Sequence, residues 1–285
     1  MKTAVIDVRH PQLACLIESF IFFSKTDASP VQYTTFPNTN LCLAIYANSS
    51  IHYTRQTTYN VCQLDSGRTY YQSRLYGFHD KPFRAALNAP LDQVCILFRP
   101  GALRAFTRAP YEELLQTDNA FEQLFSSSDK WVPEKLFDEQ SFHQRALILE
   151  DFLLKKLYPY SRDQRVSVAM ELMLSERDDH LHIDAIAKSC LVAPSTLYRL
   201  FKKEIGQNPK TFLQTVRFRK TLQQLLHKEN KGKLTSVAHA NTYYDQAHFN
   251  KEVKLLSGLR PAQLRTMASL EQEKLVWIRT NQGFA

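Results

Sequence analysis

The clearest pattern in the chain is a helical spacing of apolar positions in its second half. Apolar side chains at 183–190 lie on one side of a short helix, and Leu191-Val192-Ala193-Pro194 interrupts it. Pro194 suits the first turn of a new helix, where a missing N–H costs nothing. The next apolar positions follow the i, i+3, i+4, i+8 spacing of a buried stripe: Leu197, Leu200, Phe201 and Ile205. We therefore predict helix, tight turn, helix, with Gly206 in the left-handed conformation that ends the second helix.

This unit occurs twice. The apolar positions of its first helix, Ile183, Ile186 and Ala187, recur 51 residues later as Leu234, Val237 and Ala238. Those of its second helix and the residues that follow recur 52 residues later: Leu197, Phe201, Lys202, Gly206, Pro209 and Phe212 correspond to Phe249, Val253, Lys254, Gly258, Pro261 and Leu264. A repeat of this kind indicates two copies of one supersecondary unit.

A longer helix is predicted between the two units. Asn208 and Pro209 form a helix start signal, and a helical period continues to about His227 through Phe212, Val216, Arg219, Leu222, Leu225 and Leu226. At 1.5 Å per residue, some 18 residues span roughly 27 Å. This length is near the roughly 34 Å between successive major-groove faces on one side of B-DNA. Two helix-turn-helix units on this linker would reach adjacent major grooves of one duplex.

The first half has the pattern of short strands. Strand-like runs rich in Tyr, Phe, Thr, Val and Ile fall at 31–36, 41–46, 57–64, 74–78, 83–87 and 94–98, separated by turn residues. Many short strands at this spacing predict a β-barrel or sandwich. After Arg99-Pro100-Gly101 the pattern becomes helical and ends in a long segment at about 133–157. We predict an α+β protein of two domains, with the second domain all-helical.

The charge is unevenly distributed. Residues 1–160 hold 16 Lys/Arg and 16 Asp/Glu, whereas the rest of the chain holds 20 basic and 12 acidic residues. Within 184–265 there are 15 basic residues and 5 acidic ones, on a regular apolar pattern. A folded basic domain indicates an anionic polymer as partner, with nucleic acid favoured over a membrane surface.

Other classes are disfavoured by composition. The longest apolar stretches fall far short of a membrane span, and Asp7 and Arg9 occupy the place of a secretory signal, so we expect a cytoplasmic protein. The five cysteines form no C-x-x-C pair, which argues against a disulfide framework or zinc knuckle. The seven glycines form neither a dinucleotide-binding nor a P-loop motif.

The second helix of each unit has a polar face. In the first unit it carries Ser195, Tyr198, Arg199 and Lys202, and in the second Gln246, Ala247, His248, Asn250, Lys251 and Lys254. Arg199 and Lys251 are equivalent positions, and an arginine can donate two hydrogen bonds to guanine O6 and N7. A solvated helix face without function is the alternative for either unit taken alone.

The stretch 181–265 resembles the DNA-binding domain of AraC/XylS-type bacterial transcription regulators. The resemblance is carried by Ile186-Ala187, by 196–206, by Asn208-Pro209, by the run 243–249, and by Lys254 and Pro261. It implies base contacts from Ser195, Tyr198, Arg199, Gln246, Ala247, Asn250 and Lys251. It implies backbone contacts from Lys202, Lys210, Thr211, His248 and Lys254.

The sequence departs from the family pattern at several positions. Ala193 replaces the usual Ser or Thr cap of the first recognition helix, which removes about 1 kcal/mol of capping. In the second unit, Thr242 stands where glycine is usual, Ala247 where serine is usual, and Val253 where an aromatic residue is usual. We therefore expect the second unit to be the less stable one.

Residues 1–160 are similar to the cupin-like half of many members of this family, with the helical part at about 100–160. The resemblance rests on the architecture and on Phe98-Arg99-Pro100-Gly101. It implies small-molecule sensing and dimerisation, although no residue is assigned to an effector. His52 and His79 are isolated, so no metal or other cofactor is expected. The predicted domains are 1–160, 162–268 and a C-terminal extension at 269–285.

The leading hypothesis is a non-enzymatic, sequence-specific transcription regulator, more often an activator in this family. The resemblance implies promoter DNA, RNA polymerase, a small-molecule effector and a second copy of the chain as partners, and no membrane. One alternative is an enzyme such as a cysteine-based DNA repair protein, although Cys15, Cys42, Cys62 and Cys95 have no activating basic context in the sequence. Another is a ligand-independent regulator whose first half binds a protein.

Overall fold

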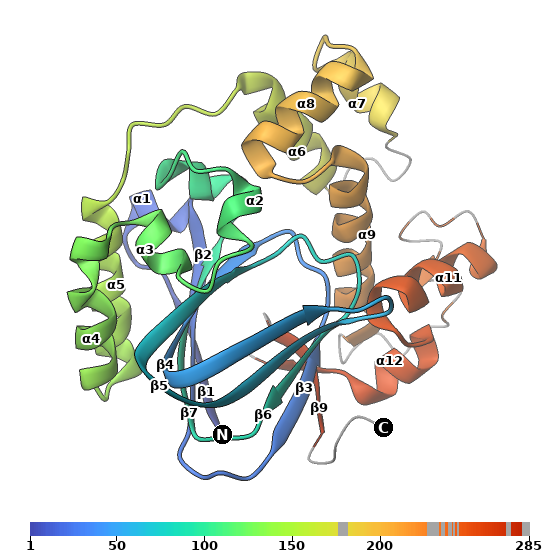
Figure 1. Cartoon of the computed structure of the whole chain (residues 1–285). Helices are drawn as coiled ribbons and strands as arrows, with labels where there is room; N and C mark the ends of the chain where they lie inside the picture. The colour runs from blue at the N-terminus through green and yellow to red at the C-terminus, as the bar shows by residue number, and fades with distance from the viewer. Residues whose placement is uncertain are drawn as a thin grey trace.

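The computed structural model describes residues 1–175, 182–226, 234, 237–238, 241, 243, 245–271 and 275–280. A curled β-sheet forms most of the first half, with short helices along one side (Figure 1). The helices of the second half lie along the opposite side of the sheet. The predicted α+β class, a β-rich first half followed by helix-turn-helix units, is confirmed.

The described strands form one sheet in the order β1-β2-β7-β4-β5-β6-β3-β9-β8. They are β1 (Lys2–Asp7), β2 (Ile17–Lys25), β3 (Val31–Thr35), β4 (Leu41–Arg55), β5 (Asn60–Tyr76), β6 (Phe83–Leu87), β7 (Leu91–Phe98), β8 (Ser269–Glu271) and β9 (Leu275–Thr280). Neighbouring strands pair antiparallel, apart from the parallel pair β5 and β6. The runs expected at 57–64 and 74–78 lie largely in the single strand β5, because Ser66 pairs with Ser49 of β4 and the strand continues through Gly67 instead of turning.

Each central strand contributes to two cores, because successive side chains of a strand point to opposite faces. On β2, Phe20 and Phe22 face the helices, whereas Ile21 and Phe23 face the inside of the curl. All four side chains are buried. This burial on both faces explains why these strands show continuous apolar runs without alternation.

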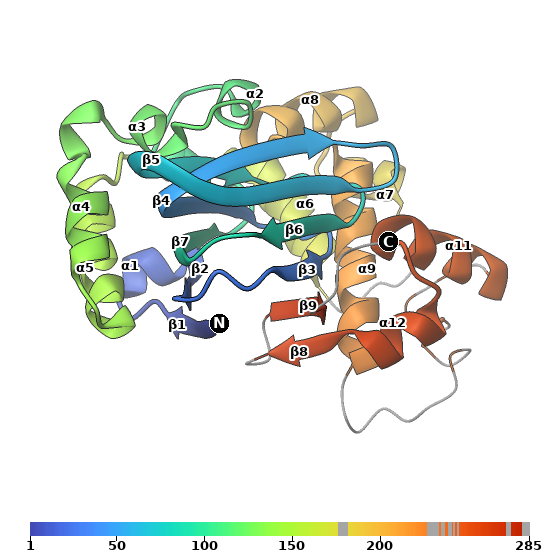
Figure 2. The same ribbon diagram turned by 60° about the horizontal axis from the view of Figure 1, so that its bottom comes forward.

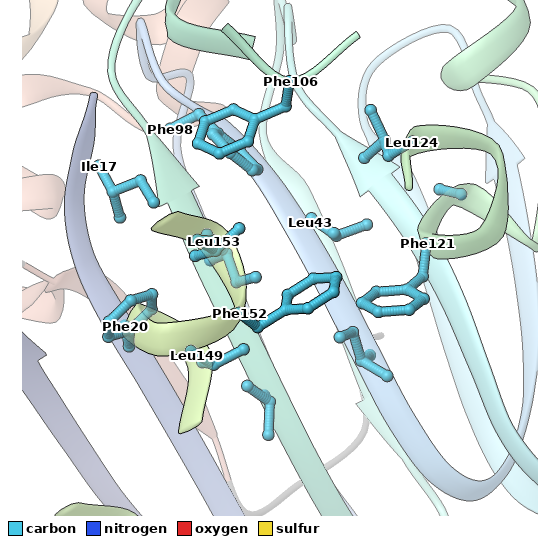
Figure 3. Packing of buried hydrophobic residues seen from close by; sticks show 14 of the residues in the cluster. Ile17, Phe20, Leu43, Phe98, Phe106, Phe121, Leu124, Leu149, Phe152 and Leu153 are labelled. Atoms are coloured by element: carbon cyan, nitrogen blue, oxygen red, sulfur yellow. The ribbon is translucent and has the colours of Figure 1, made fainter. Parts of the chain in front are cut away.

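Helices of the first half cover one face of the sheet. They are α1 (Pro11–Ala14), the 3₁₀ turn Ala102–Ala105, α2 (Tyr111–Leu114), α3 (Ala120–Leu124), the 3₁₀ turn Ser127–Asp129, α4 (Trp131–Asp138) and α5 (Phe142–Lys155). Figure 3 shows Phe121 and Phe152 side by side over Leu43 of β4. The single helical segment expected at 133–157 is wrong. The Ser141 hydroxyl accepts a hydrogen bond from the Gln144 N–H at 3.4 Å and begins a separate helix.

The second half contains α6 (Gln164–Leu174), α7 (Ile183–Ser189), α8 (Pro194–Ile205), α9 (Pro209–Leu226), α11 (Gln246–Ser257) and α12 (Pro261–Met267). The predicted first helix-turn-helix unit is α7 with α8, and the predicted linker is α9, which begins where Asn208 Oδ1 accepts from the Thr211 N–H at 2.8 Å. Ala193 occupies the N-cap position of α8 and forms no side-chain hydrogen bond there, because alanine has no polar side-chain atom. Thr242, which departs from the family pattern, lies outside the described residues.

The chain returns to the first half after α12. Strand β9 pairs with β3, placing Trp277 opposite Thr35, and Figure 2 shows the two strands side by side. The Trp277 ring packs 5.8 Å from that of Tyr33 and 6.2 Å from that of Phe23. The sequence did not predict this pairing, because nothing local in 269–285 specifies a partner strand. The expected domain boundaries stay a prediction.

Two equivalent glycines differ in their surroundings. Gly206 ends α8 with φ 86° and Gly258 ends α11 with φ 75°, so both need the left-handed conformation. A Cβ on Gly206 would lie 2.6 Å from the Phe78 ring and 2.7 Å from the Tyr111 ring, both in the first half. A Cβ on Gly258 would meet only Pro82 Cγ, at 3.3 Å.

We predict that Gly258→Ala lowers the free energy of unfolding by about 1 kcal/mol through backbone strain alone. Gly206→Ala adds overpacking against two rings and should cost about 3 kcal/mol. Urea denaturation of the two variants measures the difference. Equal losses would contradict the close packing of α8 on the first half.

Candidate nucleic-acid interface

Helix α8 separates its apolar and polar residues cleanly. Leu197, Phe201 and Ile205 are fully buried in the core of the first unit. The four predicted contact residues of this helix are all exposed, and Tyr198 keeps 50% of its surface: Ser195, Tyr198, Arg199 and Lys202. The helix therefore holds a hydroxyl, a phenol and two cations on one solvent-facing side, as the sequence predicted.

Helix α11 repeats this arrangement. Its first turn is capped by Asp245, whose carboxylate accepts from the His248 N–H at 2.7 Å, and Phe249 and Val253 are fully buried. Five of the predicted contact residues are exposed: Ala247, His248, Asn250, Lys251 and Lys254. Gln246 is half-buried, and its amide donates to Asn250 Oδ1 at 3.4 Å. Two of the predicted base contacts thus already hydrogen-bond each other.

The ring of His248 is held by its own helix. Its Nε2 lies 3.3 Å from Glu252 Oε2, and the ring packs 5.7 Å from that of Tyr243. Glu252 is buried, which raises the pKa of its carboxyl group, although Arg217 at 3.9 Å and His248 oppose this. The predicted backbone role of His248 therefore competes with an existing ion pair when the ring is protonated.

Two of the predicted backbone contacts face the first half. Lys202 and Thr211 line a groove of about 430 Å³ whose other wall includes Lys81 and Gln116. Lys210, the remaining predicted contact of this region, is exposed. The sequence did not predict this groove, because it forms between segments more than 80 residues apart.

A second groove beside α8 is strongly cationic. Its lining includes one carboxylate, Glu112, and five cationic side chains: Arg104, Arg108, Arg199, Lys202 and Lys203. Sequence reasoning missed Arg104 and Arg108, because the first half is neutral as a whole. The signal was the local run from Arg99 to Arg108, with three arginines in ten residues and no acid. The basic surface thus extends onto the first half.

Hydrogen bonds to Glu204 hold the two halves together at this point. The Tyr111 hydroxyl donates to the Glu204 backbone carbonyl at 2.9 Å, and the Tyr160 hydroxyl donates to Glu204 Oε2. Burial and this carboxylate together raise the pKa of Tyr160 to about 12. Arg162 adds a bond from Nη2 to the Pro100 carbonyl at 2.9 Å. The C-terminal end of α8 is therefore fixed against the first half.

Two of the four cysteines considered for the enzyme alternative, Cys62 and Cys95, are poorly suited to act as thiolate nucleophiles. Burial raises the pKa of the Cys62 thiol to about 11, and Cys95 is buried with its pKa raised by Cys42 and by desolvation. A thiolate nucleophile needs the opposite shift, a lowered pKa.

Within the described ranges no three His, Cys, Asp or Glu side chains gather to hold a metal ion. Among the described helices, none combines the length and apolarity needed to cross a membrane.

A known family matches part of the second half. Residues 186–267 match a family described as "Helix-turn-helix domain". This part of the chain is an AraC-type helix-turn-helix domain. Residues 10–119 match a second family, described as "Domain of unknown function (DUF6597)".

Curated relatives match over about a third of this chain. An uncharacterized HTH-type transcriptional regulator of Haemophilus influenzae is 28% identical over 109 residues, covering 38% of this chain and 36% of the relative. The lactose operon transcription activator of Staphylococcus xylosus is 27% identical over 89 residues, 31% of each chain. The match thus spans about a third of the length of these relatives.

Solved structures give weaker likenesses. The C-terminal domain of AraT, a response regulator from Geobacillus stearothermophilus, aligns with a TM-score of 0.36 and 22% identity over 40% of this chain and 93% of that one. ToxT from Vibrio cholerae aligns with a TM-score of 0.44 and 8% identity over 87% of this chain and 97% of that one.

His79 lies where the first half meets the second. It lines the groove with Lys202, accepts a hydrogen bond at Nδ1 from Asn60 Nδ2 at 3.1 Å, and packs 5.3 Å from the Phe83 ring. Burial, with a smaller contribution from Arg55, lowers the pKa of its imidazole from 6.5 to about 4. The folded protein therefore keeps His79 neutral at pH values where the unfolded chain protonates it.

We predict that His79 destabilises the fold in acid. Between pH 6.5 and 4 the unfolded state binds a proton that the folded state does not, so the free energy of unfolding falls by up to roughly 3 kcal/mol as pH decreases. Urea denaturation across this range should show a shallower pH dependence in His79→Gln than in the unaltered protein. Parallel pH profiles would show that His79 titrates alike in both states.

Proposed function

We propose that this protein is a sequence-specific DNA-binding transcription regulator whose two recognition helices, α8 and α11, enter adjacent major grooves. The observation that carries the proposal is the repeat itself: both helices bury equivalent apolar positions and expose equivalent polar ones. A solvated face without function explains one polar helix, but not the same arrangement in two copies joined by one continuous helix.

The exposed groups suit the two tasks of DNA recognition. Arg199 and Lys251 are equivalent, exposed and free to hydrogen-bond guanine, while Ser195, Tyr198, Gln246, Ala247 and Asn250 complete the proposed base contacts. Lys202, Lys210, Thr211, His248 and Lys254 are the proposed contacts to the backbone. Arg104 and Arg108 extend the cationic surface onto the first half. Such cationic side chains favour contacts to DNA phosphates over contacts to bases.

The first half is proposed to regulate DNA binding. Tyr111 and Tyr160 of the first half hydrogen-bond Glu204 near the end of α8. A change in the sheet can therefore alter the position of this proposed recognition helix. The remaining parts of the proposal are recruitment of RNA polymerase, activation more than repression, dimerisation and a cytoplasmic location. Exposed Trp131 and Leu147 on α4 and α5 offer apolar surface for a second copy.

In vitro selection from a random duplex pool tests the proposal. We predict that the full-length protein enriches a discrete motif, and that Arg199→Ala weakens binding to it by roughly 1 to 3 kcal/mol with relaxed selection in one half. Arg68→Ala, which removes an exposed arginine from β5, is the matched control and should leave binding unchanged. Equal losses on the selected and random duplexes would argue against base reading by Arg199.

Lys202→Ala tests the proposed backbone contacts. Because a phosphate contact releases a counterion, this variant should weaken binding to all duplexes alike and reduce the slope of log K against log salt by about 1. Fluorescence anisotropy at several salt concentrations measures the slope. An unchanged slope would remove Lys202 from the contact set.

A further inference from the structure

The cationic groove beside α8 has walls from both halves of the chain. It encloses about 660 Å³ and is lined by the segment 104–112 of the first half and by residues 198–206 of α8 and its end. Among the described residues, none of its five cationic side chains forms an ion pair, although Glu112 lines the same groove. Because like charges repel one another, cations gathered without counter-ions favour an anionic partner.

Arg104 is held in a fixed orientation within this groove. Its Nη1 donates to the Ala109 carbonyl at 2.6 Å, and its Cζ lies over the Tyr111 ring, 4.0 Å from the ring centre. The hydroxyl of the same tyrosine donates to the Glu204 carbonyl of α8 at 2.9 Å. A guanidinium has five N–H donors, so the bond to Ala109 leaves others to bind an anion. Arg104 is therefore positioned relative to α8 as well as to the first half.

Arg108 is a second cation of the same segment, and it is exposed. Within the described part of the chain its side chain forms no hydrogen bond or ion pair. Surface substitutions away from packed or paired groups change stability little. Removal of Arg108 should therefore leave the fold intact and change only the charge of the groove.

The neighbours of these two arginines indicate which anion binds. Tyr198 and Arg199, two proposed base contacts, line the same groove, as does Lys202, a proposed contact to the DNA backbone. A duplex whose major groove receives α8 carries its phosphates past that helix, because the two backbones border the groove. A row of closely spaced phosphates also matches cations on two separate segments better than one small anion does.

The charge of the segment 104–112 argues against a role in covering α8. A segment that blocked the helix from DNA would be expected to neutralise the cations of α8 with acids. Instead it adds two arginines to the groove against one glutamate.

We propose that Arg104 and Arg108 bind phosphates of the same duplex that α8 reads, beside the half of the motif that Arg199 contacts. This deepens the proposed function and rests on it. The first half is then part of the DNA-binding surface, and the arrangement in which Tyr111 and Tyr160 hold the end of α8 is the one that binds DNA. Separation of the two halves weakens DNA binding, because it removes two phosphate contacts.

Fluorescence anisotropy of the full-length protein with its selected duplex, at several salt concentrations, tests the proposal. Because a phosphate contact releases about one counterion, Arg108→Ala should reduce the slope of log K against log salt by about 1. Its loss of affinity should then shrink about fourfold between roughly 50 and 200 mM salt. Arg104→Met, which keeps an apolar stem on the Tyr111 ring, should give the same change. Arg68→Ala is the matched control: it removes the same charge from an exposed position of β5 and should leave the slope unchanged.

Neutral methylphosphonate linkages, placed one at a time along the duplex, locate the contact. One linkage should weaken binding of the unaltered protein by the same factor as Arg108→Ala does, and it should not weaken binding of that variant further. This linkage should lie beside the half of the motif whose selection relaxes in Arg199→Ala.

Three results would overturn the proposal: an unchanged slope in both Arg108→Ala and Arg104→Met, tighter DNA binding by either variant, or no linkage that is coupled to Arg108. If Arg104→Met does not fold, Arg108→Ala decides alone. A protein that selects a motif and loses slope in Lys202→Ala, but not in these two variants, refutes this inference and keeps the proposed function. Failure to select any motif removes both.

Discussion

The arrangement of the molecule depends on the packing of one helix, α9. Its N-terminal half places Phe212 and Val216 in the core of the first helix-turn-helix unit, and its C-terminal half places Phe218 and Leu222 in the core of the second. Both units are thus attached to one continuous helix of 18 residues. Their relative orientation follows from the rigidity of an internally hydrogen-bonded helix, which holds the proposed recognition helices α8 and α11 in one arrangement.

The same helix also contacts the first half. The Phe218 ring packs 6.4 Å from that of Phe36, one residue past β3, and Arg219 faces a cavity inside the sheet. Strand β9 adds a second connection through its pairing with β3. The end of α8, held by Tyr111 and Tyr160, adds a third. A change in the sheet therefore has three routes to the second half, one of which ends on α8, a proposed recognition helix.

The sequence predicted the elements that depend on local patterns of residues. Helical spacing located α8 and α9 within a residue or two, and the repeat located α11, because amphipathic periodicity and end signals such as Asn208 and Gly206 act over a few residues. Where a local signal was ambiguous, the prediction failed. Ser66-Gly67 has the composition of a turn but lies inside β5, where the pairing with β4 overrides it.

Features that depend on long-range contacts could not be predicted. No property of 275–280 specifies β3 as its partner, since strand pairing depends on the whole sheet. The groove beside α8 is lined by both Arg108 and Lys203, which are about a hundred residues apart in the sequence. Counting the charges of each half separately therefore did not reveal it. Arg219 was visible as a cation at an apolar position, yet only the fold shows that this position borders a cavity.

Two units on one rigid helix are proposed to read a single duplex together. Hydroxyl-radical footprinting of the full-length protein on a selected duplex tests it most directly. Two protected patches are expected on one face of the DNA, separated by about one helical turn of roughly 10 base pairs. Protection of a single patch, or uniform protection that disappears with salt, would contradict it, because the second unit would then not enter the groove.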